Sequence, residues 1–417
     1  MRLRIPGRDG GGMSARRRRR LVVVTLLSSL VAAGVPASAM AAPTQWWHDQ
    51  YGIRAAWSTT RGEGVRIAII DSGIGDNSSL NANVVDGEDF SGDGSSGGRT
   101  PVSDHPDHGT LVASLAAGTI GSAPDAELIS LSIGFDSDRD VAEAVIWAVD
   151  HGADVINLSL TRNSLDWPRS WDEAFLHAEQ HDVVVVTAAG NRAQGSASVG
   201  APATMPGVLV VAGLTRGGTA SWGASSQGIT LGVAAPSEGL IAAMPGGGTR
   251  GFNGTSGAAP VVAGVVALVR AAHPELDAAN VINRILVTAD DAGPAGPDLS
   301  YGWGVLDAAA AVTAHVDTVD VNPLGTLAEW IHVHRRAEVD NGPLPIPSAS
   351  DDSLGGTVRP PESAGEPADV GAAAEPDPLV AFRVEALPWL FTVLISLLAI
   401  GSVVALLLYF RSARPKG

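Results

Sequence analysis

Short apolar runs alternate with longer amphipathic stretches through the middle of the chain. The runs are rich in β-branched residues and predict strands, whereas the stretches between them carry apolar residues at helical spacing. The expected strands cover residues 65–70, 128–133, 155–160, 183–188, 208–212 and 229–233, and the expected helices cover 110–117, 139–151, 170–181 and a segment starting near 256. This alternation favours an α/β fold with a central parallel sheet covered by helices on both faces. In such sheets, sites lie at the carboxyl ends of the strands.

Both ends of the chain carry a membrane signal. Five arginines at 16–20 precede the apolar run 21–35 and the small residues at 37–42, which is the pattern of a secretory signal peptide. An uncleaved anchor is the alternative. Residues 387–410 contain no charge and, at about 1.5 Å per residue, are long enough to cross a bilayer. Basic residues follow them, so the positive-inside rule predicts a cytoplasmic tail and an extracytoplasmic domain.

These signals divide the chain into six parts. We expect a signal peptide (1–41), an N-terminal extension (42–64), a folded domain (65–319), a linker rich in Pro, Ala and acidic residues (320–386), a transmembrane helix (387–410) and a cytoplasmic tail (411–417). The linker cannot bury enough apolar surface to offset its ordering entropy. Within it, residues 330–336 are expected to form a surface strand or a docking segment, and the two histidines there leave a metal site as the alternative.

Composition narrows the possible functions. The formal net charge of −17 argues against nucleic acid as the main partner. The chain contains no cysteine, which excludes disulfides, a thiol nucleophile and a cysteine metal site. Hydrophobic residues make up 45% of the chain, so an exported domain of this size can draw its stability from core packing.

Three polar side chains occur where expected strands end or an expected helix begins. Asp71 ends the first strand, a position where an Asp commonly forms a turn. His108 opens the helix at 110–117, and a capping or metal-binding histidine is the alternative there. Asn191 follows the strand at 183–188 after small residues, where a turn role is equally consistent.

A serine at a predicted helix start completes the set. Ser256 lies between small residues and precedes a long apolar run. It is either an N-cap or a nucleophile whose oxyanion meets the helix N–H groups and macrodipole. With the three residues above, it supplies the carboxylate, imidazole, amide donor and hydroxyl of nucleophilic acyl transfer.

Four motifs resemble, in this order, the signature motifs of the subtilisin-like serine proteases: Asp71-Ser72-Gly73, His108-Gly109-Thr110, Ala189-Gly190-Asn191 and Gly254-Thr255-Ser256. The resemblance covers about residues 65–311 and implies a three-layer fold with a parallel sheet between two helix layers. It implies that Ser256 is the nucleophile, His108 the general base and Asp71 its orienting partner. It also implies that Asn191 and the backbone N–H of Ser256 stabilise the oxyanion.

Within this family the chain is most similar to the mycosins, the membrane-anchored subtilases of type VII secretion systems. The features they share are the export signal, the short N-terminal extension, the Pro-rich linker and the single C-terminal span. About 30 residues separate the expected cleavage site from Asp71, which leaves no room for a long pro-domain. Mycosins generally carry cysteines, and this chain has none.

The resemblance also implies where substrate binds. Extended peptides form backbone hydrogen bonds with a cleft edge and place alternate side chains in pockets. The implied edge is Ser159, Leu160 and Thr161, and the implied walls of the primary pocket are Ala188, Ala189 and Gly190. Because these walls are small, we expect a roomy, mostly apolar pocket.

Two positions depart from the family pattern. Thr161 replaces the usual glycine of the substrate edge. Gly257 follows Ser256 where many relatives carry Met or Phe, and glycine in a helix costs about 1 kcal/mol relative to better helix formers. The first departure concerns the specificity pocket, and the second concerns helix propensity and packing.

The main expectation is a membrane-anchored extracytoplasmic serine endopeptidase linked to type VII secretion. It would need no cofactor, and its partners would be a protein or peptide substrate, the membrane and a secretion membrane complex. The alternative is a structural subunit of that complex in which proteolysis is secondary. A metallohydrolase using His105, Asp107 and His108 is a third hypothesis, but no H-E-x-x-H pattern accompanies these residues. Structural calcium cannot be assigned, because no loop is rich enough in carboxylates.

Overall fold

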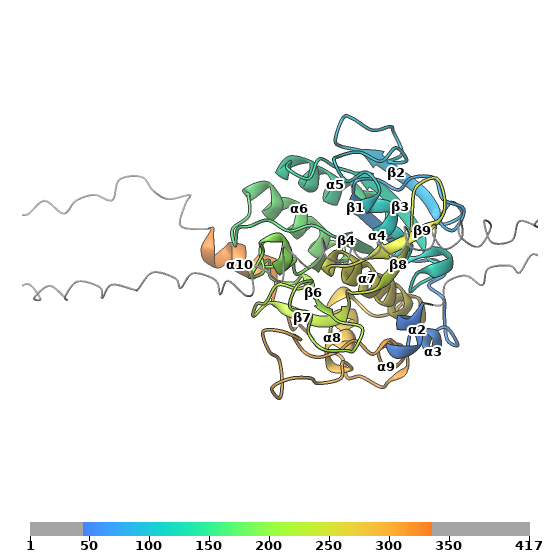
Figure 1. The fold of residues 1–417 in the computed structure, drawn as a ribbon. Helices are drawn as coiled ribbons and strands as arrows, with labels where there is room; N and C mark the ends of the chain where they lie inside the picture. The colour runs from blue at the N-terminus through green and yellow to red at the C-terminus, as the bar shows by residue number, and fades with distance from the viewer. Residues whose placement is uncertain (1–44, 336–417) are drawn as a thin grey trace, which may run out of the picture. The chain divides into compact units, whose positions relative to one another are not determined.

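The computed structural model describes residues 45–335, and the expected signal peptide, transmembrane helix and cytoplasmic tail lie outside them. Its centre is a seven-stranded parallel sheet (Figure 1). The strands are β1 (Arg66–Asp71), β2 (Val84–Asp89), β3 (Glu127–Ser132), β4 (Val155–Leu158), β5 (Val184–Ala188), β6 (Leu209–Leu214) and β7 (Leu231–Pro236). Their spatial order is β2-β3-β1-β4-β5-β6-β7. The prediction of an α/β fold with a central parallel sheet is confirmed.

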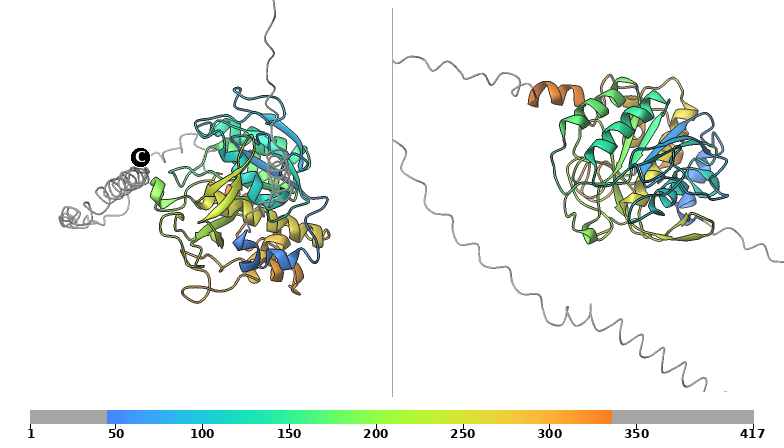
Figure 2. Two further views of the ribbon diagram at one scale, coloured as in Figure 1. Left: turned by 45° about the vertical axis from the view of Figure 1, so that its right-hand side comes forward. Right: turned by 90° about the horizontal axis from the view of Figure 1, so that it is seen from above.

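Helices cover both faces of this sheet (Figure 1 and Figure 2). One layer contains α5 (Asp138–Asp150) and α6 (Arg169–Gln180). The other contains α4 (His108–Ala116), α7 (Thr255–Ala272), α8 (Ala278–Val287) and α9 (Ala308–Thr313). The chain thus has two hydrophobic cores, one on each side of the sheet.

Strand β1 shows why the strands are apolar throughout. Successive side chains in a strand point to opposite faces. Ile67 and Ile69 belong to the core under α4 and α7, whereas Ala68 and Ile70 belong to the core under α5 and α6. Because both faces are buried, the strand reads as a continuous apolar run, and a polar residue can stand only at its end.

Three strands are absent from the sequence-based prediction. The edge strand β2 is largely polar and partly exposed. Strands β8 (Leu240–Ala243) and β9 (Thr249–Phe252) form an antiparallel hairpin, and β9 has three exposed residues. The strand expected at 229–233 begins only at Leu231, because Ile229 is 88% exposed.

Among the helices within residues 45–335, only α7 is long enough and apolar enough to cross a membrane. It is mostly buried and packs on α4 and on strands β4 to β7. Its apolar character is therefore explained by its position in the core of the domain.

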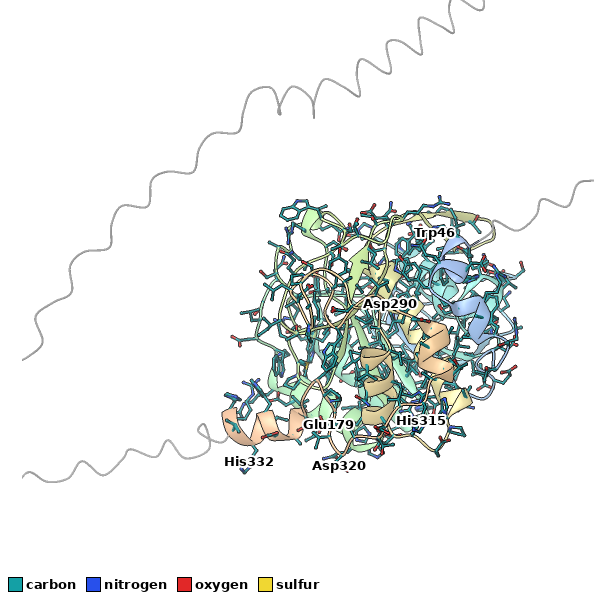
Figure 3. All side chains as sticks on the ribbon, turned by 90° about the horizontal axis from the view of Figure 1, so that it is seen from below. Trp46, Glu179, Asp290, His315, Asp320 and His332 are labelled. Atoms are coloured by element: carbon teal, nitrogen blue, oxygen red, sulfur yellow. The ribbon has the colours of Figure 1, made fainter. Side chains whose placement is uncertain are left out.

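The segment after residue 319 differs from the expected linker. Helix α10 (Leu327–His334) packs on α6, and Leu327 is buried. The carboxylate of Glu179 accepts hydrogen bonds from the first N–H groups of α10, from Leu327 at 2.6 Å and from Ala328 at 3.4 Å (Figure 3). The surface strand expected at 330–336 is therefore wrong through residue 334, whereas the docking segment, the other expectation for these residues, agrees with the packing of residues up to 335 on the domain.

The N-terminal extension is described from residue 45. Helices α2 (Trp46–Gln50) and α3 (Ile53–Ala56) bring Trp47 and Ile53 into the core, and α3 packs on α9. The indole N–H of Trp57 donates to the carbonyl of Ser122 at 2.7 Å. Residues 45–64 therefore pack on the body of the domain, and none of them lines the cleft described below.

Candidate active site

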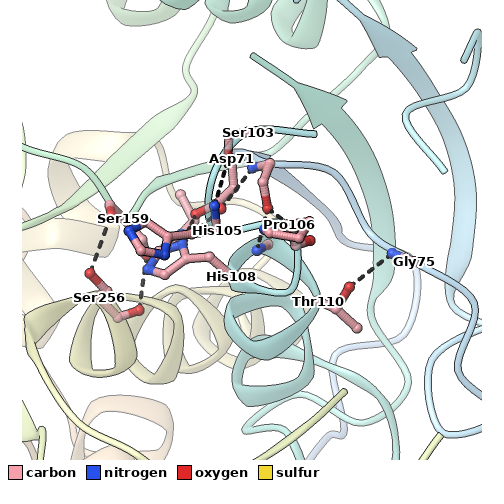
Figure 4. Close-up of polar contacts among 12 residues, drawn as sticks. Asp71, Gly75, Ser103, His105, Pro106, His108, Thr110, Ser159 and Ser256 are labelled. Atoms are coloured by element: carbon pink, nitrogen blue, oxygen red, sulfur yellow. Dashed lines mark hydrogen bonds and ion pairs between the residues drawn. The ribbon is translucent and has the colours of Figure 1, made fainter. Parts of the chain in front are cut away.

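Asp71 and His108 form a closely bonded pair at the carboxyl end of strand β1 (Figure 4). Asp71 is the last residue of β1 and is fully buried. The Nδ1 atom of His108, the first residue of α4, lies 2.8 Å from Oδ1 and 2.9 Å from Oδ2 of Asp71. A buried carboxylate is costly unless it is partnered, so this contact and the 2.7 Å hydrogen bond from the Ser72 N–H stabilise Asp71.

The pair changes the basicity of His108. Burial of the imidazole acts to lower its pKa, but attraction to the Asp71 carboxylate and the hydrogen bond with it outweigh burial and raise the pKa above its ordinary value. The side chain remains 20% exposed, so it can reach a ligand. The rings of Phe135 and Phe252 meet the imidazole edge-on, with centroids 6.0 and 5.5 Å away. These rings limit the directions from which water approaches.

Ser256 lies in the first turn of α7 and faces His108 across the cleft (Figure 4). The N-cap of this helix is Gly254, whose φ of 119° belongs to the region that favours glycine. The hydroxyl of Ser256 therefore makes no capping bond and instead donates to the carbonyl of Ser159 at 3.3 Å. The interpretation of Ser256 as an N-cap is thereby excluded.

Asn191 follows β5 and is held beside the start of α7. Its Oδ1 atom accepts hydrogen bonds from the backbone N–H of Thr255 at 2.8 Å and from the Thr255 hydroxyl at 3.2 Å. Its Nδ2 atom donates to Oε1 of Gln194 at 3.0 Å. A Cβ atom at Gly254 would lie within 3.1 to 3.4 Å of the amide, so glycine permits this close approach.

A cleft of about 580 Å³ joins these groups to the expected substrate edge. His108, Asn191 and Ser256 line it. Five of the six expected substrate-binding residues line it as well: Ser159, Leu160, Thr161, Ala188 and Gly190. Ala189 does not, because its side chain is fully buried in the core.

A slightly larger hollow, of about 670 Å³, lies elsewhere on the domain, between the β7 region and the loop at 294–303. Exposed apolar side chains such as Ile229 and Leu299 line it, and none of the acyl-transfer groups does. The convergence of a carboxylate, an imidazole, an amide and a hydroxyl therefore makes the smaller cleft the candidate active site, although it is not the largest hollow.

The structure explains the unusual Gly257. A Cβ atom at this position would lie 2.6 Å from Cδ1 of Leu240 and 3.2 Å from Cδ1 of Phe252. Neighbouring side chains therefore already fill the space in which a larger residue would sit. The expected loss of packing does not occur, because the β8–β9 hairpin supplies the missing apolar atoms.

Several residues of the site were not predicted. Phe135 follows β3, so the rule that sites lie at strand ends could have suggested it. Phe252 comes from the β8–β9 hairpin and Gln194 from a short 3-10 helix at 192–194, and their local sequence gives no such signal. Asp107 is paired with Arg250 at 2.5 Å rather than with His105, and residues 45–335 contain no group of three or more potential metal ligands.

Comparisons with known proteins agree with this geometry. The profile of the subtilase family matches residues 62–304. Alkaline elastase YaB from Bacillus sp. (strain YaB) is 32% identical over 264 residues, which cover 60% of this chain and 65% of that protein. The chain thus spans slightly less than two thirds of this relative.

Solved structures give the same result. MycP1 from Mycobacterium smegmatis is 28% identical with a TM-score of 0.57, over 70% of this chain and 89% of that one. Fervidolysin from Fervidobacterium pennivorans is 29% identical with a TM-score of 0.60, over 66% of this chain and 46% of that one. The predicted resemblance to subtilisin-like proteases, and to the mycosins among them, is confirmed, and the chain belongs to the subtilase family.

Proposed function

We propose that this chain is a serine endopeptidase that cleaves peptide bonds through Asp71, His108 and Ser256. The observation that carries the proposal is the close pair of buried Asp71 and partly exposed His108, which faces Ser256 in one cleft. A serine hydroxyl is a weak nucleophile near neutral pH, and it becomes effective when an oriented imidazole accepts its proton. The raised pKa of His108 strengthens it as a base.

Acylation uses each group in turn. The Ser256 hydroxyl leaves the Ser159 carbonyl and attacks the carbonyl carbon of the scissile bond, while its proton moves to Nε2 of His108. Asp71 keeps Nδ1 protonated and stabilises the positive imidazolium. The negative oxygen of the tetrahedral intermediate receives hydrogen bonds from Nδ2 of Asn191 and from the backbone N–H of Ser256, which is free at a helix start.

Acylation ends when His108 gives its proton to the leaving amine, so that the peptide bond breaks and an acyl-enzyme ester remains on Ser256. Deacylation then repeats these steps with water as the nucleophile. Water enters, His108 accepts one of its protons, and the resulting hydroxide attacks the ester carbonyl. The acid product leaves, and the proton returns to the Ser256 oxygen.

We further propose that the enzyme is extracytoplasmic and anchored by residues 387–410, and that it acts with a type VII secretion system. The anchor and its orientation follow from the hydropathy and charge of those residues. The link to secretion follows from similarity to the MycP1 structures, one of which is described as from the ESX-1 type VII secretion system.

A second candidate function is a structural role in a secretion membrane complex, with proteolysis secondary. It is favoured by the description of one similar protein, MycP1, as an essential component of such a system. The two functions are compatible, because proteolysis uses the cleft and assembly would use other surfaces.

Labelling of the full-length chain in membranes with a fluorophosphonate, which reacts with activated serines, tests the proposal. The wild type and Ser58→Ala should be labelled, and Ser256→Ala should not. Ser58 is a matched control because it is exposed and bonds only its own helix turn, through the carbonyl of Ala55. Equal labelling of Ser256→Ala and wild type would refute Ser256 as the nucleophile. An unlabelled wild type, together with secretion that survives in Ser256→Ala cells, would favour the structural role.

A further inference from the structure

Thr161 lies on one wall of the primary pocket and faces Gly190 on the other. Its segment follows β4, and Gly190 follows β5, the neighbouring parallel strand. The carboxyl ends of these strands thus supply opposite walls of one slot beside Ser256. Only two positions in the described part of the chain combine a positive φ with a side chain, Ser103 and Asp182, so Thr161 adopts an ordinary backbone conformation.

The side chain of Thr161 crosses this slot. A Cβ atom placed on Gly190 would lie 3.3 Å from Cγ2 of Thr161. The methyl group is therefore at most about 4.8 Å from the Gly190 Cα, since one C–C bond adds about 1.5 Å. On its other side, the Thr161 hydroxyl lies 3.4 Å from the carbonyl oxygen of Arg162 and 3.5 Å from that of Gly200.

The Thr161 side chain lies beside two separate hollows. Thr161 and Gly190 line the catalytic cleft of about 580 Å³. Gly200 and Ser196 line a separate hollow of about 440 Å³. The Thr161 side chain thus has its methyl group facing Gly190 in the cleft and its hydroxyl facing the Gly200 carbonyl, which belongs to the second hollow.

A large side chain cannot enter such a slot. A flat ring between two walls needs about 7 to 8 Å, which is two carbon–carbon contacts of about 3.5 to 4.0 Å each. The space between Gly190 and the Thr161 methyl is well below that. Threonine is also stiff at χ1, so the methyl group does not swing aside freely.

We propose that Thr161 closes the primary specificity pocket, so that the enzyme selects peptides with a small side chain, such as Ala, Gly or Ser, immediately before the scissile bond. This inference rests on the proposed peptidase function and specifies its substrate class. It also corrects the expectation of a roomy pocket, because that expectation took account of the small wall residues and not of the residue facing them.

A peptide series tests the inference on the full-length chain. The peptides differ only in the residue before the scissile bond, which is Ala, Leu or Phe. The wild type should favour Ala over Phe in kcat/KM by about 10- to 100-fold, and Thr161→Gly should raise kcat/KM for Phe by a similar factor. Thr161→Val should keep the preference for Ala, because valine has the shape of threonine and lacks only the hydroxyl.

Two results would overturn the inference: a wild type that cleaves after Phe as well as after Ala, or an unchanged ratio in folded Thr161→Gly. If Thr161→Gly fails to fold, as judged by its unfolding temperature, Thr161→Ala removes the same methyl group and replaces it in the comparison. If the wild type neither cleaves nor reacts with fluorophosphonate, the proposed function fails separately. Calorimetric binding of product peptides ending in Ala or Phe to Ser256→Ala, with and without Thr161→Gly, then decides the pocket question without catalysis.

Discussion

The two halves of the cleft are built differently. In the proton-transfer half, Asp71 and His108 bond each other, and Asp71 is fully buried. In the substrate-facing half, the polar groups form hydrogen bonds with residues that take no part in acyl transfer. Nδ2 of Asn191 donates to Gln194, and the Thr161 hydroxyl donates to backbone carbonyls. The first half is organised for the reaction before substrate arrives. In the second half, neighbouring residues determine what can bind and how readily.

Burial explains this difference. A charged group inside the domain must be partnered, so Asp71 has one strongly favoured arrangement. Asn191 is partly exposed and Gln194 is exposed, so substrate atoms can replace their mutual hydrogen bond. We therefore expect substitutions in the first half to change catalysis greatly and substitutions in the second half to tune it.

Asp71→Asn, in the proton-transfer half, should have the largest effect on activity. It should lower kcat by about 10⁴-fold, because an amide does not hold the imidazole in the required tautomer. The acid limb of kcat/KM should also move to lower pH. Activity falls as the pH drops through the pKa of His108, and Asp71 raises that pKa. Without the carboxylate, burial still lowers the pKa, so the imidazole stays unprotonated to a lower pH.

Rates of peptide cleavage across a pH series would measure both effects. Asp125→Asn is the matched control, because that carboxylate is exposed on the surface and paired with Arg61. A loss of less than tenfold in Asp71→Asn, or an acid limb that moves upward, would contradict the assigned role of Asp71.

Asn191→Ala should have an intermediate effect. Loss of one oxyanion donor should lower kcat by about 10² to 10³-fold with little change in KM, which is the magnitude known for this type of donor in the related subtilisin. Single-turnover kinetics would separate the chemical step from binding. The unfolding temperature serves as control, because Asn191 also bonds the Thr255 N–H. A normal kcat would show that another donor serves the oxyanion.

Gln194→Ala should have the smallest effect, and in the opposite direction. The Gln194 oxygen accepts a hydrogen bond from Nδ2 of Asn191, the amino group from which the oxyanion must also accept one, and it can hold this group turned away from the oxyanion, while Thr255 independently fixes the oxygen of the Asn191 amide. Loss of one net hydrogen bond of about 0.5 to 1.5 kcal/mol should raise kcat/KM by about 2- to 12-fold. Gln50→Ala is a control on an exposed glutamine outside the cleft. A decrease in Gln194→Ala would mean that Gln194 positions Asn191 instead of competing for it.

Much of the fold and the positions of the acyl-transfer groups could be predicted from sequence. Strands buried on both faces must be apolar throughout, so Asp71 and Asn191 stood out where such runs end. The edge strand β2 and strand β9 could not be predicted in this way, because they are partly exposed and their apolar patterns are weak. Strand β8 is apolar and mostly buried but only four residues long. Helix α10 was missed because it is short and because its docking depends on the distant Glu179.

The sequence by itself determined the α/β class, the order of the acyl-transfer residues and the absence of cysteine chemistry. Those properties depend on local periodicity and on residue type. Only the tertiary structure decided that Ser256 is not a helix cap, that Gly257 leaves no void, and that the methyl group of Thr161 faces Gly190. Each of these findings depends on how close atoms from separate segments come to each other in the fold. The local sequence around either segment does not specify that distance.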